Sequence, residues 1–383
     1  MPFTYQYITT ADARDAAIAD LAREPIVGVD TEGASLHRYR DRVSLIQISG
    51  AESHYVFDPL LLDTVLPLGA LFENRSILKV FHGADYDILS LKRDFSFQID
   101  PIFDTALAAR ATGITAFSLQ NLLAHFFQVI VSKAHQKSDW SRRPLSQSQL
   151  DYAAGDTAYL VRLYGLLTTA VAERGRTDQI EEDCRLLSGI EWGDRDEADP
   201  MRIRGAATLP TEAKRIFPSL VALRNRLAEA RDVPTFKVVS NDDLLTLAKA
   251  APSDSEGLVK CFERPRSVLL RHAEAWLGAV AAGRVADAPQ INRSRTPRRP
   301  PPTPAQEQMI TNLVTWRNQQ AATEGVEPAM VLTSGAIRQI VMEEVRAPDA
   351  LTPFLRQWQV RRYADALISH LTAATNPPAP ATT

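Results

Sequence analysis

The chain has 383 residues, of which 45% are hydrophobic and 23% charged, and its formal net charge is −3. This length favours two to four domains, because one domain commonly holds roughly 100–200 residues. The slightly negative charge excludes a uniformly basic nucleic-acid-binding protein, so a polyanion must be held by local patches or a bound metal. Two cysteines, Cys184 and Cys261, exclude a disulfide framework and a cysteine-based zinc site. We expect a cytoplasmic protein without a membrane span, because the sequence shows neither a secretory signal nor a sufficiently long apolar run.

The first 130 residues alternate between strand and helix signals. Apolar, β-branched or alternating runs predict strands over residues 26–30, 42–49, 54–57 and 77–81. Helices are expected over residues 60–72, after the break at Pro59, and over residues 86–93. Three strands joined by short turns, followed by strand–helix alternation, favour a mixed sheet with helices packed on it.

Residues 104–187 are predicted to be mostly helical. Asp104 is expected to cap a helix over residues 105–110, because an aspartate side chain accepts from the free backbone N–H groups of a first turn. A polar loop, SKAHQKSDWSRRP, occupies residues 132–144, and one long helix is expected over residues 146–171. The acidic stretch DRDEADP at residues 194–200 is typical of a linker.

The second half of the chain contains an internal repeat. LVALRNRLAEARDVP begins at Leu220 and LVTWRNQQAATEGVEP begins at Leu313, and each copy ends on a similar helical segment, RHAEAWL or RYADALI. Two copies of a helical unit of roughly 70 residues account for this pattern. Between them, RSRTPRRPPPTP at residues 293–304 is basic and proline-rich, as extended linkers are. We therefore divide the chain into residues 1–200, 208–286, 287–304, 305–372 and a disordered tail at 373–383.

Two carboxylates, Asp30 and Glu32, end the first predicted strand. Strand side chains alternate between faces, so residues i and i+2 project together. Carboxylates on an apolar strand are costly to bury unless they are paired or bind a metal. Taken alone, the pair is better explained as capping a strand-to-loop turn.

Further acidic residues follow in two other elements. Asp85 and Asp87 come after the predicted strand at residues 77–81, where they favour a helix N-terminus or serve as ligands. Tyr152 and Asp156 are four residues apart on a predicted helix and therefore share one face. Tight packing of that helix explains its small residues equally well. Carboxylates gathered from three elements nevertheless favour a site for Mg²⁺ or Mn²⁺, which prefer oxygen ligands.

The sequence resembles the ribonuclease D family, within the DEDD superfamily of 3′→5′ exonucleases. The matching segments are VDTE, FHGADYDI, FDT, KSDWSRRPL and DYAAGDTAYL, at residues 29–32, 81–88, 103–105, 137–145 and 151–160. Tyr152 stands four residues before Asp156, as in the tyrosine branch of the superfamily, whereas the histidine branch would have its histidine at the position of Asp151. The duplicated unit resembles the HRDC module. The resemblance covers roughly residues 5–371.

This resemblance implies an α/β fold, an RNase H-like mixed sheet flanked by helices, followed by two small all-α helical bundles. It implies 3′→5′ hydrolysis of RNA to 5′-mononucleotides with two divalent metal ions, Mg²⁺ or Mn²⁺, and tRNA precursors or other 3′-extended structured RNA as substrates of a monomer. Tyr152 would position the attacking water. The metal ligands implied are Asp30, Glu32, Asp87 and Asp156. Asp85 competes with Asp87, but the family's aspartate falls five residues after His82, which selects Asp87.

Other features leave alternatives open. Gln47, His82 and Lys137 could contact substrate or have structural or solvated roles. The arginines of the proline-rich linker could bind phosphates or be solvated; they are Arg293, Arg295, Arg298 and Arg299. The same five catalytic residues would suit a DNA exonuclease, and the helical repeats alone would suit a non-catalytic nucleic-acid-binding scaffold.

Overall fold

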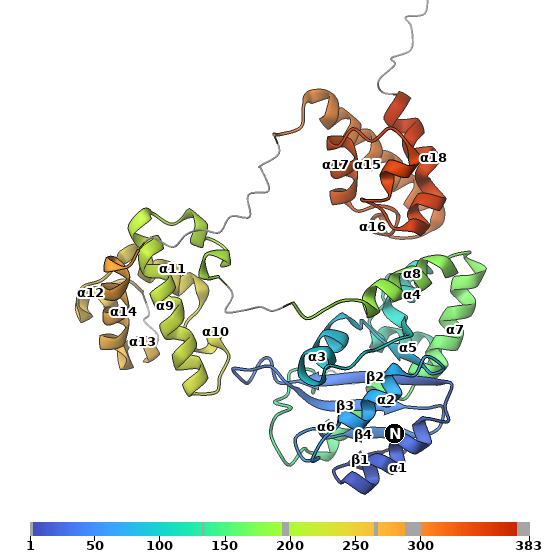
Figure 1. Cartoon of the computed structure of the whole chain (residues 1–383), viewed down its shortest axis with the longest axis horizontal. Helices are drawn as coiled ribbons and strands as arrows, with labels where there is room; N and C mark the ends of the chain where they lie inside the picture. Colours follow the sequence, from blue (N-terminus) through green and yellow to red (C-terminus); the bar gives the residue numbers. More distant parts are fainter. Residues whose placement is uncertain (1–2, 132–133, 194–198, 264–266, 288–299, 374–383) are drawn as a thin grey trace, which may run out of the picture.

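The computed structural model describes residues 3–131, 134–193, 199–263, 267–287 and 300–373. These form an α/β domain and two helical units (Figure 1). The arginines of the basic linker and the tail after residue 373 lie outside the described residues. Within the described parts, no helix combines the length and the apolar character that a bilayer span requires. The expected α/β fold followed by all-α units is confirmed.

The α/β domain is built on one mixed sheet of six strands in the order β1-β4-β3-β2-β5-β6. Its antiparallel pairs are β2–β3 and β3–β4, whereas β1–β4, β2–β5 and β5–β6 are parallel. The strands are β1 (Gln6–Ile8), β2 (Ile26–Gly33), β3 (Val43–Ser49), β4 (His54–Phe57), β5 (Leu78–Phe81) and β6 (Ile102–Asp104). All residues of β3, β4 and β6 are buried, which explains their apolar sequences. The four predicted strands are confirmed; β1 and β6, with three residues each, are too short to give a clear periodic signal.

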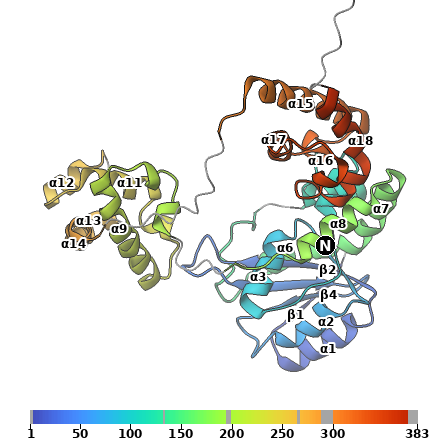
Figure 2. The same ribbon diagram turned by 45° about the horizontal axis from the view of Figure 1, so that its top comes forward.

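Helices cover this sheet, with α6 and α7 packed on its central strands (Figures 1 and 2). Asp104 caps α4 as predicted, because its carboxylate accepts from the backbone N–H groups of Ala106 and Leu107. The helices of this domain are α1 (Ala11–Leu21), η1 (Leu66–Leu68), α2 (Gly69–Glu73), α3 (Asp85–Phe95), α4 (Thr105–Ala111), α5 (Leu119–Phe127), α6 (Gln147–Thr157), α7 (Leu160–Glu173) and α8 (Thr177–Ser188).

Two helix predictions were wrong in their extent. The helix expected over residues 60–72 is a turn followed by η1 and α2, because Pro67 lacks an N–H and is tolerated only in a first helical turn. The helix expected over residues 146–171 is divided into α6 and α7. At this break Thr157 hydrogen-bonds Ser49 of β3 at 2.7 Å. Packing against the sheet therefore overrides the helical propensity of the segment.

The two helical units have separate cores. In the first, Trp276, Phe217 and Leu220 are fully buried around α9 and α14. It comprises η2 (Pro200–Arg202), η3 (Ala206–Thr208), α9 (Thr211–Ala230), α10 (Thr235–Val238), α11 (Asn241–Ala250), α12 (Ser255–Lys260), α13 (Ser267–Arg271) and α14 (Ala273–Val285). The second is built around Leu313 and Leu367. It comprises α15 (Pro304–Glu324), α16 (Pro328–Val331), α17 (Ser334–Met342), η4 (Pro348–Leu351) and α18 (Gln357–Ala373).

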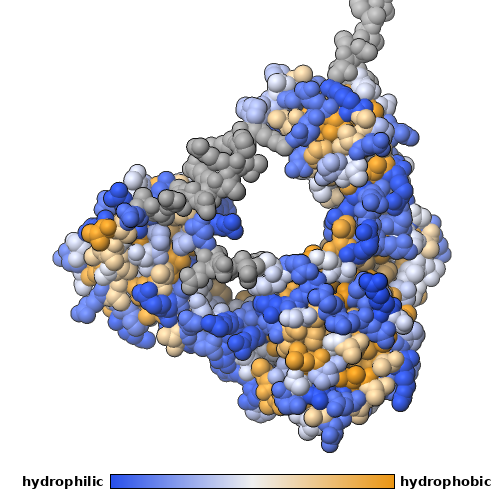
Figure 3. Space-filling model, viewed as in Figure 1, coloured by the Kyte–Doolittle hydropathy of each residue, from blue (hydrophilic) through white to orange (hydrophobic). Residues whose placement is uncertain are grey.

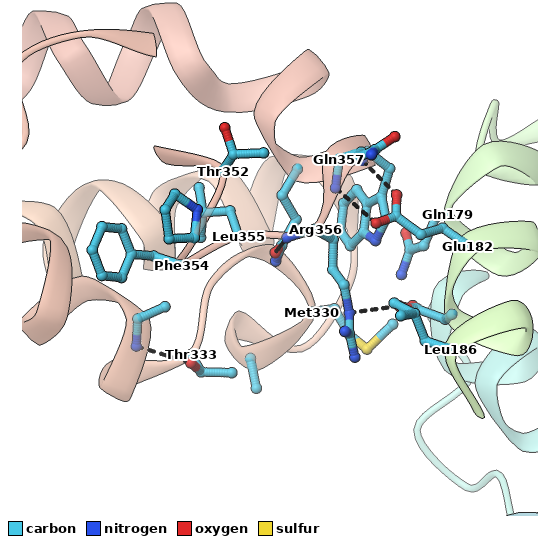
Figure 4. A pocket seen from close by; sticks show the side chains of 16 residues that line it. Gln179, Glu182, Leu186, Met330, Thr333, Thr352, Phe354, Leu355, Arg356 and Gln357 are labelled. Atoms are coloured by element: carbon cyan, nitrogen blue, oxygen red, sulfur yellow. Dashed lines mark hydrogen bonds and ion pairs between the residues drawn. The ribbon is translucent and has the colours of Figure 1, made fainter. Parts of the chain in front are cut away.

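The second helical unit lies against α8 of the α/β domain (Figures 1 and 2). The Glu182 carboxylate of α8 accepts from the backbone N–H groups of Gln357 and Trp358, at 2.8 and 2.9 Å, and so caps α18 across the interface (Figure 4). Arg176, which is 2% exposed, pairs with Glu324 of α15. Met330 of the second unit joins the core of the α/β domain. These contacts make the two bodies one packed structure.

Candidate active site

The central strand β2 carries the first two acidic residues of the site. Asp30 and Glu32 are two residues apart and project from the same face of the strand. Asp30 pairs across the sheet with Gln47 of β3, and Glu32 pairs with Leu45. A register shift follows directly, between Glu32 and Gly33. Asp30 therefore lies within the β2–β3 ladder, and Glu32 lies close to its end, at the register shift.

The end of α6 brings a third carboxylate to this strand. One oxygen each from Asp30, Glu32 and Asp156 lie within 4.8 Å of one another. Gly28 makes the approach possible, because a Cβ there would lie 2.8 Å from the Cβ of Leu160 and 3.0 Å from the Thr157 carbonyl oxygen. The close contact between strand and helix thus depends on the absence of a side chain at residue 28.

Asp87 is held beside this cluster. It is 6% exposed in the first turn of α3, and its Oδ1 accepts from the backbone N–H of Thr31 at 3.1 Å and from the Thr31 hydroxyl at 2.5 Å. Asp85 is exposed instead. Sequence reasoning missed Thr31, although its place between Asp30 and Glu32 was a usable signal: it must face away from them, toward the other side of the strand.

The site concentrates negative charge away from water. Burial, followed by repulsion from Asp156 and Asp87, raises the pKa of Glu32 to about 9. Burial also raises the pKa values of Asp87 and Asp156 to about 7. The pKa of Asp30 is raised by burial and by repulsion from the neighbouring carboxylates. A cation at the cluster would offset this repulsion, and three convergent carboxylate oxygens form a donor set that suits a hard divalent ion.

Tyr152 lies one helical turn before Asp156 and hydrogen-bonds its carboxylate. Burial raises the pKa of the Tyr152 phenol, as do the charges of Asp156 and Glu32. The phenol therefore stays protonated and can donate a hydrogen bond. Its ring lies near two aromatic rings of the polar loop, with centroid distances of 6.1 Å to His135 and 6.0 Å to Trp140.

A buried ion pair anchors this loop. Arg143 donates to both carboxylate oxygens of Asp58, at 2.5 and 2.7 Å, and to the carbonyl oxygens of Trp140 and Ser44, at 2.6 and 2.9 Å. Asp58 is fully buried, and Trp140 is 1% exposed. The KSDWSRRPL motif thus encodes a support for the Tyr152 ring. Asp58 lies too far away in sequence to have been connected with it.

A cavity of about 360 Å³ opens over the cluster. His82 lines it, with Nδ1 2.9 Å from the Thr105 hydroxyl, and burial lowers the pKa of its imidazole. Lys137 is exposed, and its neighbour Gln136 lines the cavity instead. Gln47 is fully buried, and its amide atoms have no hydrogen-bond partner among the described residues. Besides Thr31, sequence reasoning missed three polar lining residues, which are Ser118, Gln120 and Gln136.

Comparison with known proteins identifies the family. A 3′-5′ exonuclease family model matches residues 5–172, and an HRDC domain model matches residues 213–280. The ribonuclease D of Acidiphilium cryptum is 30% identical over 385 residues, spanning 94% of this chain and 91% of its own length. This chain belongs to the ribonuclease D family. It is therefore a 3′→5′ exoribonuclease, as expected, and its acidic cluster fits the use of a divalent metal ion.

Other relatives agree with this assignment. The ribonuclease D of Jannaschia sp. is 32% identical over 295 residues, spanning 75% of this chain and 73% of its own. The crystal structure of Escherichia coli RNase D superposes with a TM-score of 0.71 at 22% identity, covering 97% of this chain and 99% of that one. That likeness shows that the overall fold of ribonuclease D is shared.

Proposed function

We propose that this ribonuclease D family member removes nucleotides singly from the 3′ end of RNA, releasing 5′-mononucleotides, and that Asp30, Glu32, Asp87, Tyr152 and Asp156 form its active site. The observation that carries the proposal is the convergence of three carboxylate oxygens within 4.8 Å, beside a protonated tyrosine. We assign residues 1–200 to the exonuclease domain, and residues 208–286 and 305–372 to two HRDC-like domains.

The carboxylates would hold two divalent ions, Mg²⁺ or Mn²⁺. Asp30 would serve both ions, with Glu32 and Asp156 completing one site and Asp87 supporting the other through water. Two such ions activate a water molecule and stabilise the leaving oxygen of a phosphodiester. Both hydrogen bonds from Thr31 go to the same oxygen of Asp87, Oδ1. Tyr152 would orient the water by donating or accepting a hydrogen bond at its phenol oxygen.

The substrates proposed are tRNA precursors or other structured RNAs with 3′ extensions, and the enzyme is proposed to act as a cytoplasmic monomer. Membership of the ribonuclease D family supports the substrate class. Digestion of a 3′-extended tRNA and of an unstructured RNA of equal length would test it. Faster trimming that stops at the structured body supports the proposal, whereas equal rates and complete degradation contradict it.

Replacing Asp30 tests the metal assignment. Asp30→Asn should lower kcat on a 3′-extended RNA by at least about a thousandfold, because losing a ligand shared by two ions removes several kcal/mol of transition-state stabilisation. The thermal shift produced by Mn²⁺ should also shrink. Asp151→Asn is the matched control, since Asp151 hydrogen-bonds Tyr5 and Gln147 rather than the cluster. An Asp30→Asn rate within tenfold of the parent would overturn the assignment.

Removing the phenol oxygen tests the role of Tyr152. Tyr152→Phe should lower kcat by roughly 10- to 100-fold, because it removes one hydrogen-bonding group from the reacting water. The Mn²⁺-dependent thermal shift should remain, since the carboxylates are intact. If the variant hydrolyses RNA as fast as the parent, Tyr152 has no part in the reaction.

A further inference from the structure

A second cavity, of about 630 Å³, lies near the catalytic one. Gly83 and Phe117 line it, and each is the direct neighbour of a residue that lines the catalytic cavity, His82 or Ser118. The two cavities share no lining residue, but successive residues of the chain bring them close together at two places. A nucleotide in the catalytic cavity would therefore have this space near it.

The walls of the second cavity combine apolar surface with cations. Phe117 is half-buried, and the Arg110 guanidinium lies over its ring, 5.2 Å from the centroid. Leu186 of α8 also lines this cavity, and Arg356 extends toward α8 from the second helical unit (Figure 4). An aromatic ring beside guanidinium groups is the usual platform for the bases of single-stranded nucleic acid.

The carboxylates in this cavity differ in their partners. Asp104 accepts from four backbone N–H groups, at 2.7 to 3.2 Å, and Asp183 pairs with Arg356 at 3.2 Å. Asp85 is exposed, and among the described residues no hydrogen bond or ion pair is found for it. A free carboxylate repels phosphate, but it accepts a hydrogen bond from a hydroxyl group. The 2′-OH is the hydroxyl that distinguishes RNA from DNA.

We propose that this cavity binds the RNA nucleotide that precedes the 3′-terminal one, with its base against Phe117 and its ribose 2′-OH hydrogen-bonded to Asp85. The inference rests on the proposed function, because it requires the terminal nucleotide to occupy the catalytic cavity. It assigns part of the preference for RNA to a residue outside the metal site. RNA bound in this cavity would also contact the interface between α8 and the second helical unit.

Phe117→Ala tests the base contact with two substrates. One is a ten-nucleotide unstructured RNA, and the other is the p-nitrophenyl ester of a nucleoside 5′-monophosphate, which fills only the catalytic cavity. The kcat/KM for RNA should fall about 5- to 100-fold further than that for the ester, the range expected for a lost base–aromatic stack. Phe117→Leu, which keeps an apolar side chain, should show the same selective loss. Leu66→Ala, at an exposed apolar residue that does not line either cavity, is the matched control.

Asp85→Ala tests the ribose contact. The parent should cleave all-RNA roughly tenfold better than RNA carrying one 2′-deoxy nucleotide next to the 3′-terminal one, and the variant should lose that difference. Glu181→Ala, at another exposed carboxylate, should retain it.

The outcomes separate the two proposals. If the parent hydrolyses neither substrate with Mg²⁺ or Mn²⁺, the proposed function fails. If the parent is active but the Phe117 variants lose activity equally on both substrates, or on neither, the cavity does not bind the preceding nucleotide. If Asp85→Ala still cleaves all-RNA better than the 2′-deoxy substrate by the same factor as the parent, Asp85 does not bind the ribose.

Discussion

The two helical units share a repeated sequence but meet the α/β domain in different ways. The second unit buries Arg176 and Glu182 of the α/β domain against its own helices. The first unit is met by the loop after β2, where Arg38 pairs with Asp232 and Arg40 pairs with Glu229. Hydrophilic atoms dominate the visible part of that junction (Figure 3). Fold similarity between repeats therefore says nothing about how each repeat docks.

The difference has an energetic consequence. Arg38 and Asp232 are 36% and 58% exposed, and exposed ion pairs contribute about 0–1 kcal/mol. Glu182 is 7% exposed and accepts one buried hydrogen bond, from the N–H of Trp358, and one part-buried hydrogen bond, from the N–H of Gln357. Losing a buried hydrogen-bond partner costs about 1–3 kcal/mol for each group left. We therefore expect the second unit to stay docked under conditions that release the first.

The largest effect is expected at Gly113, whose φ is +86°. A Cβ there would lie 2.3 Å from the carbonyl oxygen of Gly325 in the second unit. Gly113→Ala should push the second unit away, costing ~1–3 kcal/mol beyond the backbone strain. Gly175→Ala is the matched control, since φ is +58° there and no atom lies within 4 Å of the added Cβ. Hydrogen exchange of the backbone amides in α8 and α18 should become faster in Gly113→Ala and not in Gly175→Ala. Equal exchange rates in the two variants would show that close contact between Gly113 and Gly325 is not needed for docking.

Glu182→Ala should have an intermediate effect. It removes the cap of α18 and leaves the N–H groups of Gln357 and Trp358 without their acceptor, at a cost of ~2 kcal/mol. Faster exchange of these two amides and a lower Tm should follow. Glu181→Ala, at the exposed neighbouring residue, should leave both unchanged. If the two variants melt at the same temperature, the carboxylate does not stabilise the interface.

The smallest effect is expected at the first unit. A double-mutant cycle of Arg38→Ala and Asp232→Ala should give a coupling energy of about 0.5 kcal/mol or less, and added salt should abolish it. Thermal unfolding of the parent, the single variants and the double variant measures it. A coupling above about 2 kcal/mol that persists at high salt would mean that this unit is held as firmly as the second.

Features that depend only on neighbouring residues could be predicted from the sequence. Alternation placed Asp30 and Glu32 on one face of β2, a four-residue spacing placed Tyr152 and Asp156 on one face of α6, and Asp104 marked the start of α4. The repeated Leu-Val-x-x-Arg-Asn pattern showed the duplication. These are consequences of local backbone geometry, which a short stretch of sequence encodes.

Contacts between residues far apart in the sequence became apparent from the folded structure alone. It divided the expected long helix where Thr157 reaches Ser49, and it joined Thr31 to Asp87 across 56 residues and Asp58 to Arg143 across 85. It also docked the second helical unit through Arg176 and Glu182, whereas the first is contacted by Tyr39 and by exposed ion pairs. Such contacts depend on how complete elements pack together, so neither residue of a pair carries a local signal that identifies its partner.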